Sequence, residues 1–272
     1  MEKHIEIERS IIKKYRKGIW NKFIGALKDY ELIAPHDKIA VCISGGKDSF
    51  VLALCLRCLQ RYSKMPFELE YLCMDPGYLP KNRALIEKNA AIMQIPLRFF
   101  STDIFDTVTD VKGGSPCYVC ARMRRGFLYK EAKALGCNKI ALGHHFDDAI
   151  ETVLMSMLYA GELKAMMPKL HSEHYEGMEL IRPLYLVRED DIIRWKNYND
   201  LEFLGCACRF TEGLKQGTHT SARSDVKALI KTLSSHNSQV PANILAATHS
   251  VHSATMPGTV VNGEKHSFLE KY

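Results

Sequence analysis

Short apolar segments alternate with longer amphipathic segments through the first 200 residues, and this alternation is the strongest constraint on the fold. The apolar runs predict strands at 39–44, 67–75, 97–103, 139–145 and 179–185. The segments that follow them predict helices at 48–61, 80–94, 117–136, 147–160 and 188–200. Strands joined by helices of this length form right-handed crossovers between parallel neighbours. The sequence therefore predicts an α/β fold with a doubly wound parallel sheet.

Two further segments flank the predicted sheet. Near the N-terminus, apolar side chains recur at helical spacing and basic side chains occupy positions between them. The apolar set is Ile5, Ile12, Tyr15, Ile19, Phe23 and Leu27, and the basic set is Lys13, Lys14, Arg16, Lys17 and Lys22. After residue 210 serine, threonine, histidine and glycine become frequent, with one clear helical run at 224–235. We therefore expect a basic amphipathic helix in 1–34, a central domain in 35–210 and a helical C-terminal tail in 211–272.

The composition argues against several classes of protein. No apolar run approaches the roughly 20 residues that a membrane-spanning helix needs, and the first ten residues carry charges rather than an apolar signal core. We therefore expect a cytoplasmic protein with no membrane partner. Nine cysteines in such a chain favour reduced thiols or metal ligands over a disulfide framework. The formal charge of +6 is a weak indication of a polyanionic partner.

The stretch SGGKDS joins the first predicted strand to the helix after it. Its residues are Ser44, Gly45, Gly46, Lys47, Asp48 and Ser49. The two glycines let backbone N–H groups approach a phosphate, and the helix N-terminus contributes its positive dipole end. The lysine adds charge and the serines add hydroxyl donors, whereas Asp48 is unfavourable beside phosphates unless it caps the helix or binds magnesium. An ordinary strand-to-helix turn is the alternative to a phosphate-binding loop.

Cys117 and Cys120 lie about one turn apart at the start of a predicted helix. The helix N-terminus, with Arg122, Arg124 and Arg125 close behind, favours the thiolate form of both side chains. Neighbouring thiolates in positive surroundings suit a metal ion, an iron–sulfur cluster or redox chemistry. The spacing alone is a weak signal, because CLRC earlier in the chain repeats it.

The other cysteines form two groups. Five lie in or beside apolar segments and are interpreted as core residues, namely Cys42, Cys55, Cys58, Cys73 and Cys137. Cys206 and Cys208 instead lie in a glycine-flanked loop. Two cysteines from the predicted helix and one from this loop make three ligands, a number that leaves one iron of a four-iron cluster open.

The stretch GHHFDDAIET, 143–152, places polar side chains at the end of a predicted strand and the start of the next helix. Asp147 and Asp148 either cap that helix or hold magnesium at the edge of the sheet where the glycine-rich loop lies. His145 is a candidate for proton transfer. The stretch lacks the HExxH spacing of zinc proteases.

Taken in order, the motifs resemble one family of enzymes. SGGKDS is the signature of the PP-loop ATP pyrophosphatases, and it is followed by CYVCARMRRGFLY, KIALGHHFDDAIETVLMSMLYAGELKAMMPKL, IRPLYLVREDDI and a late cysteine pair. This series resembles the tRNA 2-thiocytidine synthetases from about residue 10 to about residue 255. Two features depart from related patterns. The late pair is CxC rather than CxxC, and the chain lacks the terminal zinc-binding CxxC pairs of a related uridine-thiolating branch.

The resemblance implies the fold and the chemistry. The fold is expected to be of the adenine nucleotide alpha hydrolase type. The enzyme is expected to adenylate the C2 oxygen of a tRNA pyrimidine, with cytidine favoured, and to replace that oxygen with sulfur. ATP, Mg²⁺ and a [4Fe–4S] cluster are the implied cofactors. The implied partners are tRNA, a sulfur donor (a cysteine desulfurase or sulfide) and a second copy of the chain.

The resemblance also assigns residues. The nucleotide site is expected to include the six residues of SGGKDS together with Gly143 and His144. The reacting centre is assigned to Asp147, Asp148 and Arg124, and the cluster to Cys117, Cys120 and Cys206, with Cys208 as the alternative third ligand. A PP-loop enzyme that uses zinc or a persulfide on another substrate is the main alternative. A non-catalytic nucleotide- or RNA-binding module is the third.

Overall fold

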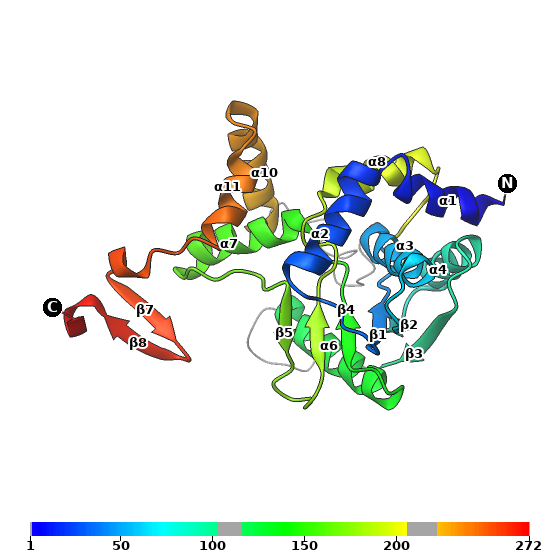
Figure 1. Ribbon diagram of the computed structural model, residues 1–272, viewed down its shortest axis with the longest axis horizontal. Coiled ribbons are helices and arrows are strands. Elements are labelled where there is room, and N and C mark those ends of the chain that lie inside the picture. The colour runs from blue at the N-terminus through cyan, green and yellow to red at the C-terminus, as the bar shows by residue number, and fades with distance from the viewer. Residues whose placement is uncertain (1, 103–115, 206–221, 272) are drawn as a thin grey trace. The chain divides into compact units, whose positions relative to one another are not determined.

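The computed structural model of the chain describes residues 2–102, 116–205 and 222–271, with the backbone alone at 116–122 and at Lys271 (Figure 1). The helices of the first part are α1 (Lys3–Ile12), the π-helical turn η1 (Arg16–Trp20), α2 (Asn21–Asp29), α3 (Lys47–Tyr62), α4 (Pro80–Ile92), α6 (Pro116–Ala134), α7 (Phe146–Ala160) and α8 (Glu189–Tyr198). The strands there are β1 (Lys38–Cys42), β2 (Glu68–Asp75), β3 (Leu97–Ser101), β4 (Lys139–Ala141), β5 (Lys169–His171) and β6 (Glu179–Ile181). The chain forms two compact units, Met1–Ala149 with Met167–His219, and Ile150–Met166 with Thr220–Tyr272.

The sheet of the first unit has six strands in the order β3-β2-β1-β4-β6-β5 (Figure 1). All neighbouring pairs are parallel except β5 and β6, and this confirms the predicted α/β fold with a mostly parallel sheet. The fifth predicted strand, 179–185, is too long, since β6 ends at Ile181 and a turn begins at Pro183, which lacks an N–H for the ladder. The short antiparallel strand β5 was not predicted.

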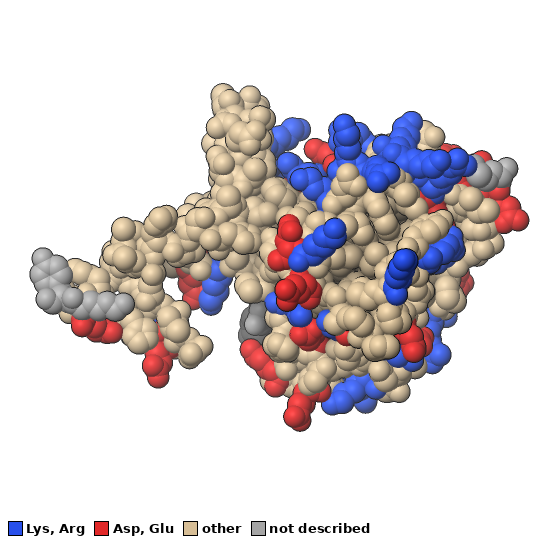
Figure 2. Space-filling model, viewed as in Figure 1, with Lys and Arg blue, Asp and Glu red and all other residues tan. Residues whose placement is uncertain are grey.

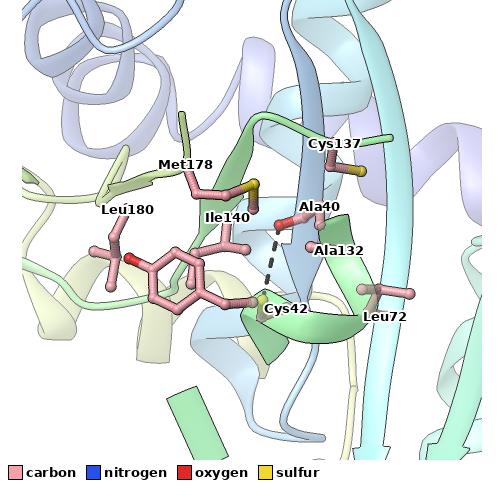
Figure 3. Packing of buried hydrophobic residues seen from close by; sticks show 9 residues of the cluster. Ala40, Cys42, Leu72, Ala132, Cys137, Ile140, Met178 and Leu180 are labelled. Atoms are coloured by element: carbon pink, nitrogen blue, oxygen red, sulfur yellow. Dashed lines mark hydrogen bonds between the residues drawn. The ribbon is translucent and has the colours of Figure 1, made fainter. Parts of the chain in front are cut away.

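Both faces of the sheet are buried, as a doubly wound arrangement requires. Ala40 and Cys42 of β1 pack in one cluster with Tyr129 and Ala132 of α6 (Figure 3). Ile39 and Val41 alternate with them along the strand, so they face the opposite side, and they are also buried. Helix α3 packs against β1 and β2, whereas α6 packs against β1, β2 and β4. This arrangement brings the start of α3 and the middle of α6 to the central strands.

The predicted single helix at the N-terminus is wrong in two respects. The segment is divided into α1, the π-helical turn η1 and α2, so its apolar residues do not form one continuous stripe. In α1 the buried side chains are Ile7 and Ile11, while Ile5 is 42% exposed. Farther along, Ile19 and Phe23 are buried as predicted. Because the prediction assumed one helical period across the break, it assigned the wrong face of α1 to the core.

The second unit contains α10 (Ala222–His236), which confirms the predicted helix at 224–235. It also contains α11 (Val240–Ala247) and a two-stranded antiparallel hairpin of β7 (Gly258–Val261) and β8 (Glu264–Ser267), neither of which was predicted. The residues that precede and follow the hairpin form the short turns η2 (Ser253–Thr255) and η3 (Phe268–Lys271). Within the three described ranges, no helix has both the length and the apolar character that crossing a bilayer requires.

A buried lysine at the start of β4 joins this strand to β6 and to the segment before β1. The Lys139 ammonium, in a side chain only 4% exposed, lies 2.9 Å from carboxylate oxygens of both Asp37 and Glu179. It also donates a hydrogen bond to the Leu32 carbonyl oxygen at 3.1 Å. Two carboxylates and one ammonium in a region of low dielectric depend on one another, because each charge offsets the desolvation of its neighbours.

Replacing Lys139 with methionine is therefore expected to lower the free energy of unfolding by about 3–5 kcal/mol, the range for breaking a buried ion pair. Urea denaturation of the full chain measures this change. The matched control is Lys38→Met on β1, where a partly exposed lysine pairs with Glu68 and Glu70, and a much smaller loss is expected because solvent screens an exposed ion pair. If both variants lost the same free energy of unfolding, burial of the Lys139 ion pairs would not explain their contribution to stability.

Candidate active site

The loop between β1 and α3 is held in a shape that only glycine permits at one position. Gly45 has φ = +85°, and a Cβ built there would lie 2.8 Å from side-chain atoms of Ile86 and Leu204. The Ser49 hydroxyl donates to the Gly46 carbonyl oxygen at 2.8 Å and accepts from the Ser44 N–H at 3.2 Å. These bonds hold the loop as a tight turn at the start of α3. The turn surrounds the first backbone amides of that helix, which are suited to bind an anion.

A second glycine brings the end of β4 against this turn. A Cβ on Gly143 would lie 3.0 Å from the backbone nitrogen of Ser49 and 3.1 Å from the carbonyl carbon of Asp48. No side chain fits in that space without displacing the backbone of α3. The sequence placed Gly143 in the nucleotide site, and the structure shows it to be the point where the two loops touch.

A cavity of about 270 Å³ lies where these loops meet, beyond the carboxyl ends of β1, β2 and β4. It is lined by Cys42, Ile43, Ser44, Asp48, Ser49, Met74, Tyr78, Arg124, Leu128, Leu142, Gly143, His144 and Asp148. Ligands of open α/β sheets bind at this edge. Five residues from the predicted nucleotide site and two from the predicted reacting centre thus line one cavity. Gly45, Gly46 and Lys47 lie in the adjoining turn rather than in the lining.

Two side chains of this cavity have buried polar atoms without hydrogen-bond partners among the described residues. The Nε and Nη2 atoms of Arg124 are buried, and neither has a hydrogen-bond partner in the described parts of the chain. The same holds for Oδ1 of Asp48. Burial raises the pKa of the Asp48 carboxyl, although His145 and Lys47 oppose the shift. Since unpaired buried polar groups are costly, donors and an acceptor of this kind indicate a bound ligand that carries both an anion and a cation.

The two adjacent aspartates have different surroundings. Asp148 lines the cavity, and its Oδ2 accepts the His145 N–H at 3.0 Å, which caps α7. Asp147 lies outside the lining and binds the start of α8. Its carboxylate accepts the Glu189 N–H at 2.7 Å, and its two oxygens lie 3.0 and 3.3 Å from Nε of Arg188. Of the pair, Asp148 is the one that can reach a ligand in the cavity.

The loop lysine is held by carboxylates on two elements. Lys47 Nζ lies 2.9 Å from Glu189 Oε1 and 3.2 Å from Asp48 Oδ2, and all three side chains are largely buried. Sequence reasoning missed Glu189. It follows β6, which pairs with β4, and because that pairing is not encoded in the local sequence, no motif around Glu189 indicated its place in the site.

Arg182 is a second missed residue. It is 5% exposed, donates from Nε to Nδ1 of His144 at 3.3 Å, and also bonds the Met167 carbonyl oxygen. Burial lowers the pKa of its guanidinium to about 10, with the nearby Arg125 acting in the same direction, so the group stays charged at neutral pH. This contact fixes one ring nitrogen of His144 as an acceptor. His145, in contrast, is buried, with its ring 3.5 Å from Asp148 and 3.9 Å from Asp48.

The structure tests the predicted role of five of the nine cysteines. The five predicted core cysteines are all buried, and burial raises the pKa of each thiol, that of Cys137 to about 11. Cys117 and Cys120 belong to α6, but their side chains lie outside the described part of the structure, as do Cys206 and Cys208 entirely. Among the described residues, no group of three metal-binding side chains occurs.

The fold, the glycine turn and the cavity define a PP-loop nucleotide-binding protein, and residues 17–206 match the family model described as the PP-loop domain. A protein of Citrifermentans bemidjiense named tRNA-cytidine(32) 2-sulfurtransferase is 35% identical over 86% of this chain and 90% of its own length. One of the same name from Neisseria meningitidis serogroup C is 41% identical over 66% of this chain and 57% of its own. The chain therefore belongs to the tRNA-cytidine 2-sulfurtransferase family of PP-loop proteins.

A solved structure has the same fold. The U34-tRNA thiolase NcsA from Methanococcus maripaludis, solved with its [4Fe–4S] cluster, superposes with a TM-score of 0.67. The match covers 84% of this chain and 76% of that one, at 20% sequence identity. At that identity the similarity to the thiolase structure supports the fold alone.

Proposed function

We propose that this protein is an ATP-dependent tRNA thiolase that acts on cytidine. The observation that carries the proposal is the cavity beside the PP-loop, where buried atoms of Arg124 and Asp48 lack partners in the described residues. Membership in a family whose relatives are named tRNA-cytidine 2-sulfurtransferases supports the choice of substrate. A cavity with guanidinium nitrogens and a carboxylate oxygen that lack hydrogen-bond partners in the described residues suits a nucleoside triphosphate with its metal ion.

The reaction proceeds in two displacements. The C2 oxygen of cytidine attacks the α-phosphorus of ATP and pyrophosphate leaves. A sulfur nucleophile then attacks C2 and AMP leaves, so that one C–O bond is exchanged for one C–S bond. Adenylation is necessary because a ring carbonyl oxygen is a poor leaving group, whereas AMP is a good one. The net result is one thiolated base, AMP and pyrophosphate.

The residues of the turn bind the nucleotide. The backbone of Gly45 and Gly46, the start of α3 and the hydroxyls of Ser44 and Ser49 surround the pyrophosphate portion. Lys47 adds a positive charge at the edge of that site. In this proposal Asp48 and Asp148 are the oxygen ligands of Mg²⁺, which suits a hard cation.

Arg124 and His144 act nearer the reacting centre. The unpaired guanidinium nitrogens of Arg124 stabilise the negative charge that develops on the α-phosphate. His144, oriented by Arg182, lies on the same cavity wall and contacts the nucleotide or the base. Asp147, first assigned to the reacting centre, acts in this proposal through α8.

The iron–sulfur cluster is proposed at Cys117, Cys120 and Cys206. In α6 the positions of Cys117, Cys120, Arg124 and Leu128 follow the spacing i, i+3, i+7, i+11, so one helix face leads from the cysteine positions to the cavity. The five described thiols are buried in the core and cannot supply ligands. A cluster held by three protein ligands would keep one iron open for the sulfur that is transferred. Sulfide supplies that sulfur directly, whereas the persulfide sulfur of a cysteine desulfurase needs two electrons, which two thiols provide as they form a disulfide. We propose a homodimer as the working form.

The test is the iron and acid-labile sulfide content of anaerobically purified protein. We expect about four irons per chain, lost in Cys117→Ala, Cys120→Ala and Cys206→Ala but retained in Cys208→Ala. The control is Cys58→Ala, a core thiol on α3 that is expected to keep the cluster. A chain with no iron, or with one zinc, would overturn the cluster and favour zinc or persulfide chemistry at Cys117 and Cys120.

A further inference from the structure

The N-terminal helices carry an unusual segregation of charge. Between Glu8 and Asp29 the chain has no acidic residue. The cations in that interval are Arg9, Lys13, Lys14, Arg16, Lys17, Lys22 and Lys28. Most surface helices mix both signs, because opposite charges at neighbouring positions support one another. A long interval with one sign alone needs another explanation.

The fold directs these charges outward. Ile11, Ile19 and Phe23 are buried and fix the inner side of the segment. Five side chains on its outer side are exposed, and we call them the N-terminal basic face: Lys13, Lys14, Arg16, Lys17 and Lys22. Figure 2 shows Lys and Arg side chains gathered over this part of the first unit. The segregation in sequence is therefore also a segregation on the surface.

The basic face has no internal counter-charges. In the described ranges no ion pair joins any of its five side chains to a carboxylate. Elsewhere in the same unit exposed cations commonly have acidic partners, as Arg83 does with Asp75 and Glu87, and Arg194 with Asp191. Unpaired cations concentrated in one place repel one another, and a bound polyanion removes that cost.

Next to the basic face lies a groove of about 570 Å³. Its lining includes Lys3, Arg9, Lys13 and Lys14 from α1 and the turn after it, with Tyr198 from the end of α8. Lys14 Nζ lies 3.7 Å above the Tyr198 ring, which is 55% exposed. Glu6 and Asp200 also line the groove, so the lining has a net positive charge. A lysine over an exposed aromatic ring is typical of surfaces that bind phosphate backbones and bases.

Helix α8 relates this surface to the cavity. It begins at Glu189, whose carboxylate contacts Lys47, and ends at Tyr198 beneath Lys14. Ten residues of α-helix span about 15 Å. Gly18 of the π-helical turn packs directly against Asp191 of the same helix, so the basic face rests on α8. A nucleic acid on this face would be close enough for an adjoining nucleotide to reach the cavity.

We propose that the N-terminal basic face is where the protein binds the phosphate backbone of its tRNA, outside the cavity that holds the target base. The proposal rests on the proposed thiolase function and adds the docking surface to it. A protein partner fits less well, since the apolar residues of this segment face inward and lysine is depleted from the centres of protein interfaces. The periodic negative charge of an RNA backbone matches a row of unpaired cations.

The test compares two fourfold variants with the same loss of charge. The first is Lys13→Gln, Lys14→Gln, Arg16→Gln and Lys17→Gln. The control is Lys64→Gln, Lys88→Gln, Arg98→Gln and Lys130→Gln, all exposed residues elsewhere in the first unit. Binding of tRNA is measured as a function of salt concentration, and ATP binding is measured separately. The first variant is expected to bind tRNA roughly 10- to 100-fold more weakly. The slope of the logarithm of the binding constant against the logarithm of the salt concentration is expected to become less negative by about 3.

The outcomes separate this proposal from the proposed function. Weaker tRNA binding in the first variant alone, with ATP affinity unchanged, supports the docking surface. Equal losses in both variants, or none in either, overturn it, because net charge or another surface would then carry the binding. Retained tRNA affinity with loss of sulfur transfer from a protein donor would assign the face to that protein and also overturn it. If the wild type binds ATP but no tRNA, the thiolase function itself fails.

Discussion

Replacing Arg124 with methionine is expected to slow ATP-dependent adenylation of tRNA by at least about 100-fold while leaving the folded state no less stable. Two nitrogens of the guanidinium, Nε and Nη2, are buried and have no partner in the described residues, so their removal breaks no hydrogen bond of those two atoms there. Methionine fills much of the volume without a charge to desolvate. The lost rate reflects the lost stabilisation of charge at the α-phosphate, a loss of the size seen when one preorganised donor is removed.

Two measurements distinguish this role from a structural one. Single-turnover formation of pyrophosphate with tRNA reports the adenylation step, and urea denaturation reports the free energy of unfolding. Arg124→Lys is expected to recover part of the rate, because it restores the charge but not the planar donor geometry. Lys130→Met, at an exposed position on the same helix, is expected to change neither quantity. A large loss of stability in Arg124→Met would instead make Arg124 a structural residue.

Where a strand or loop carries its own signature, the sequence was sufficient to predict it. β1 and the second half of β2 are largely buried and mostly apolar, and the positive φ of Gly45 requires the first of the two glycines that follow β1. Gly143 and Asp148 follow β4 as expected, although the predicted strand at 139–145 was too long, because β4 ends at Ala141 and the polar stretch after it is a loop. These features are local, since each depends on the chain within a few residues of itself.

Features that depend on tertiary contacts were missed. Glu189 and Arg182 reach the site only because β6 lies beside β4, and strand order is not encoded in any single segment. Tyr78 lines the cavity through the loop after β2, with no pattern around it. The break between α1 and α2 was missed because apolar spacing continues across it, and the three-residue strand β5 is too short for a period of two to be recognised.

The contacts of α8 lead to the second large effect. Glu189→Gln is expected to raise the apparent KM for ATP at least about tenfold, equivalent to about 1.4 kcal/mol, with tRNA affinity unchanged. Lys47 Nζ lies 2.9 Å from the Glu189 carboxylate, and both side chains are largely buried, so this charge holds the loop lysine at the edge of the phosphate site. Steady-state kinetics with varied ATP and direct tRNA binding measure the two quantities.

Asp147 sets the position of Glu189 and should therefore act through it. Its carboxylate accepts the Glu189 N–H at 2.7 Å and also pairs with Arg188, which fixes the first turn of α8. Asp147→Asn is expected to raise the KM for ATP less than Glu189→Gln does. The double variant should be no worse than Glu189→Gln alone, because residues that act in series are not additive.

The matched control lies in the same helical turn. Asp190 is exposed and adjacent to Glu189, so Asp190→Asn removes one negative charge from the start of α8 without touching Lys47. It is expected to leave the KM for ATP unchanged. If Asp190→Asn and Glu189→Gln had the same effect, the charge of the helix terminus would be responsible rather than the contact with Lys47. If Asp147→Asn and Glu189→Gln were fully additive, the two residues would act independently, and Asp147 would return to the reacting centre as a candidate.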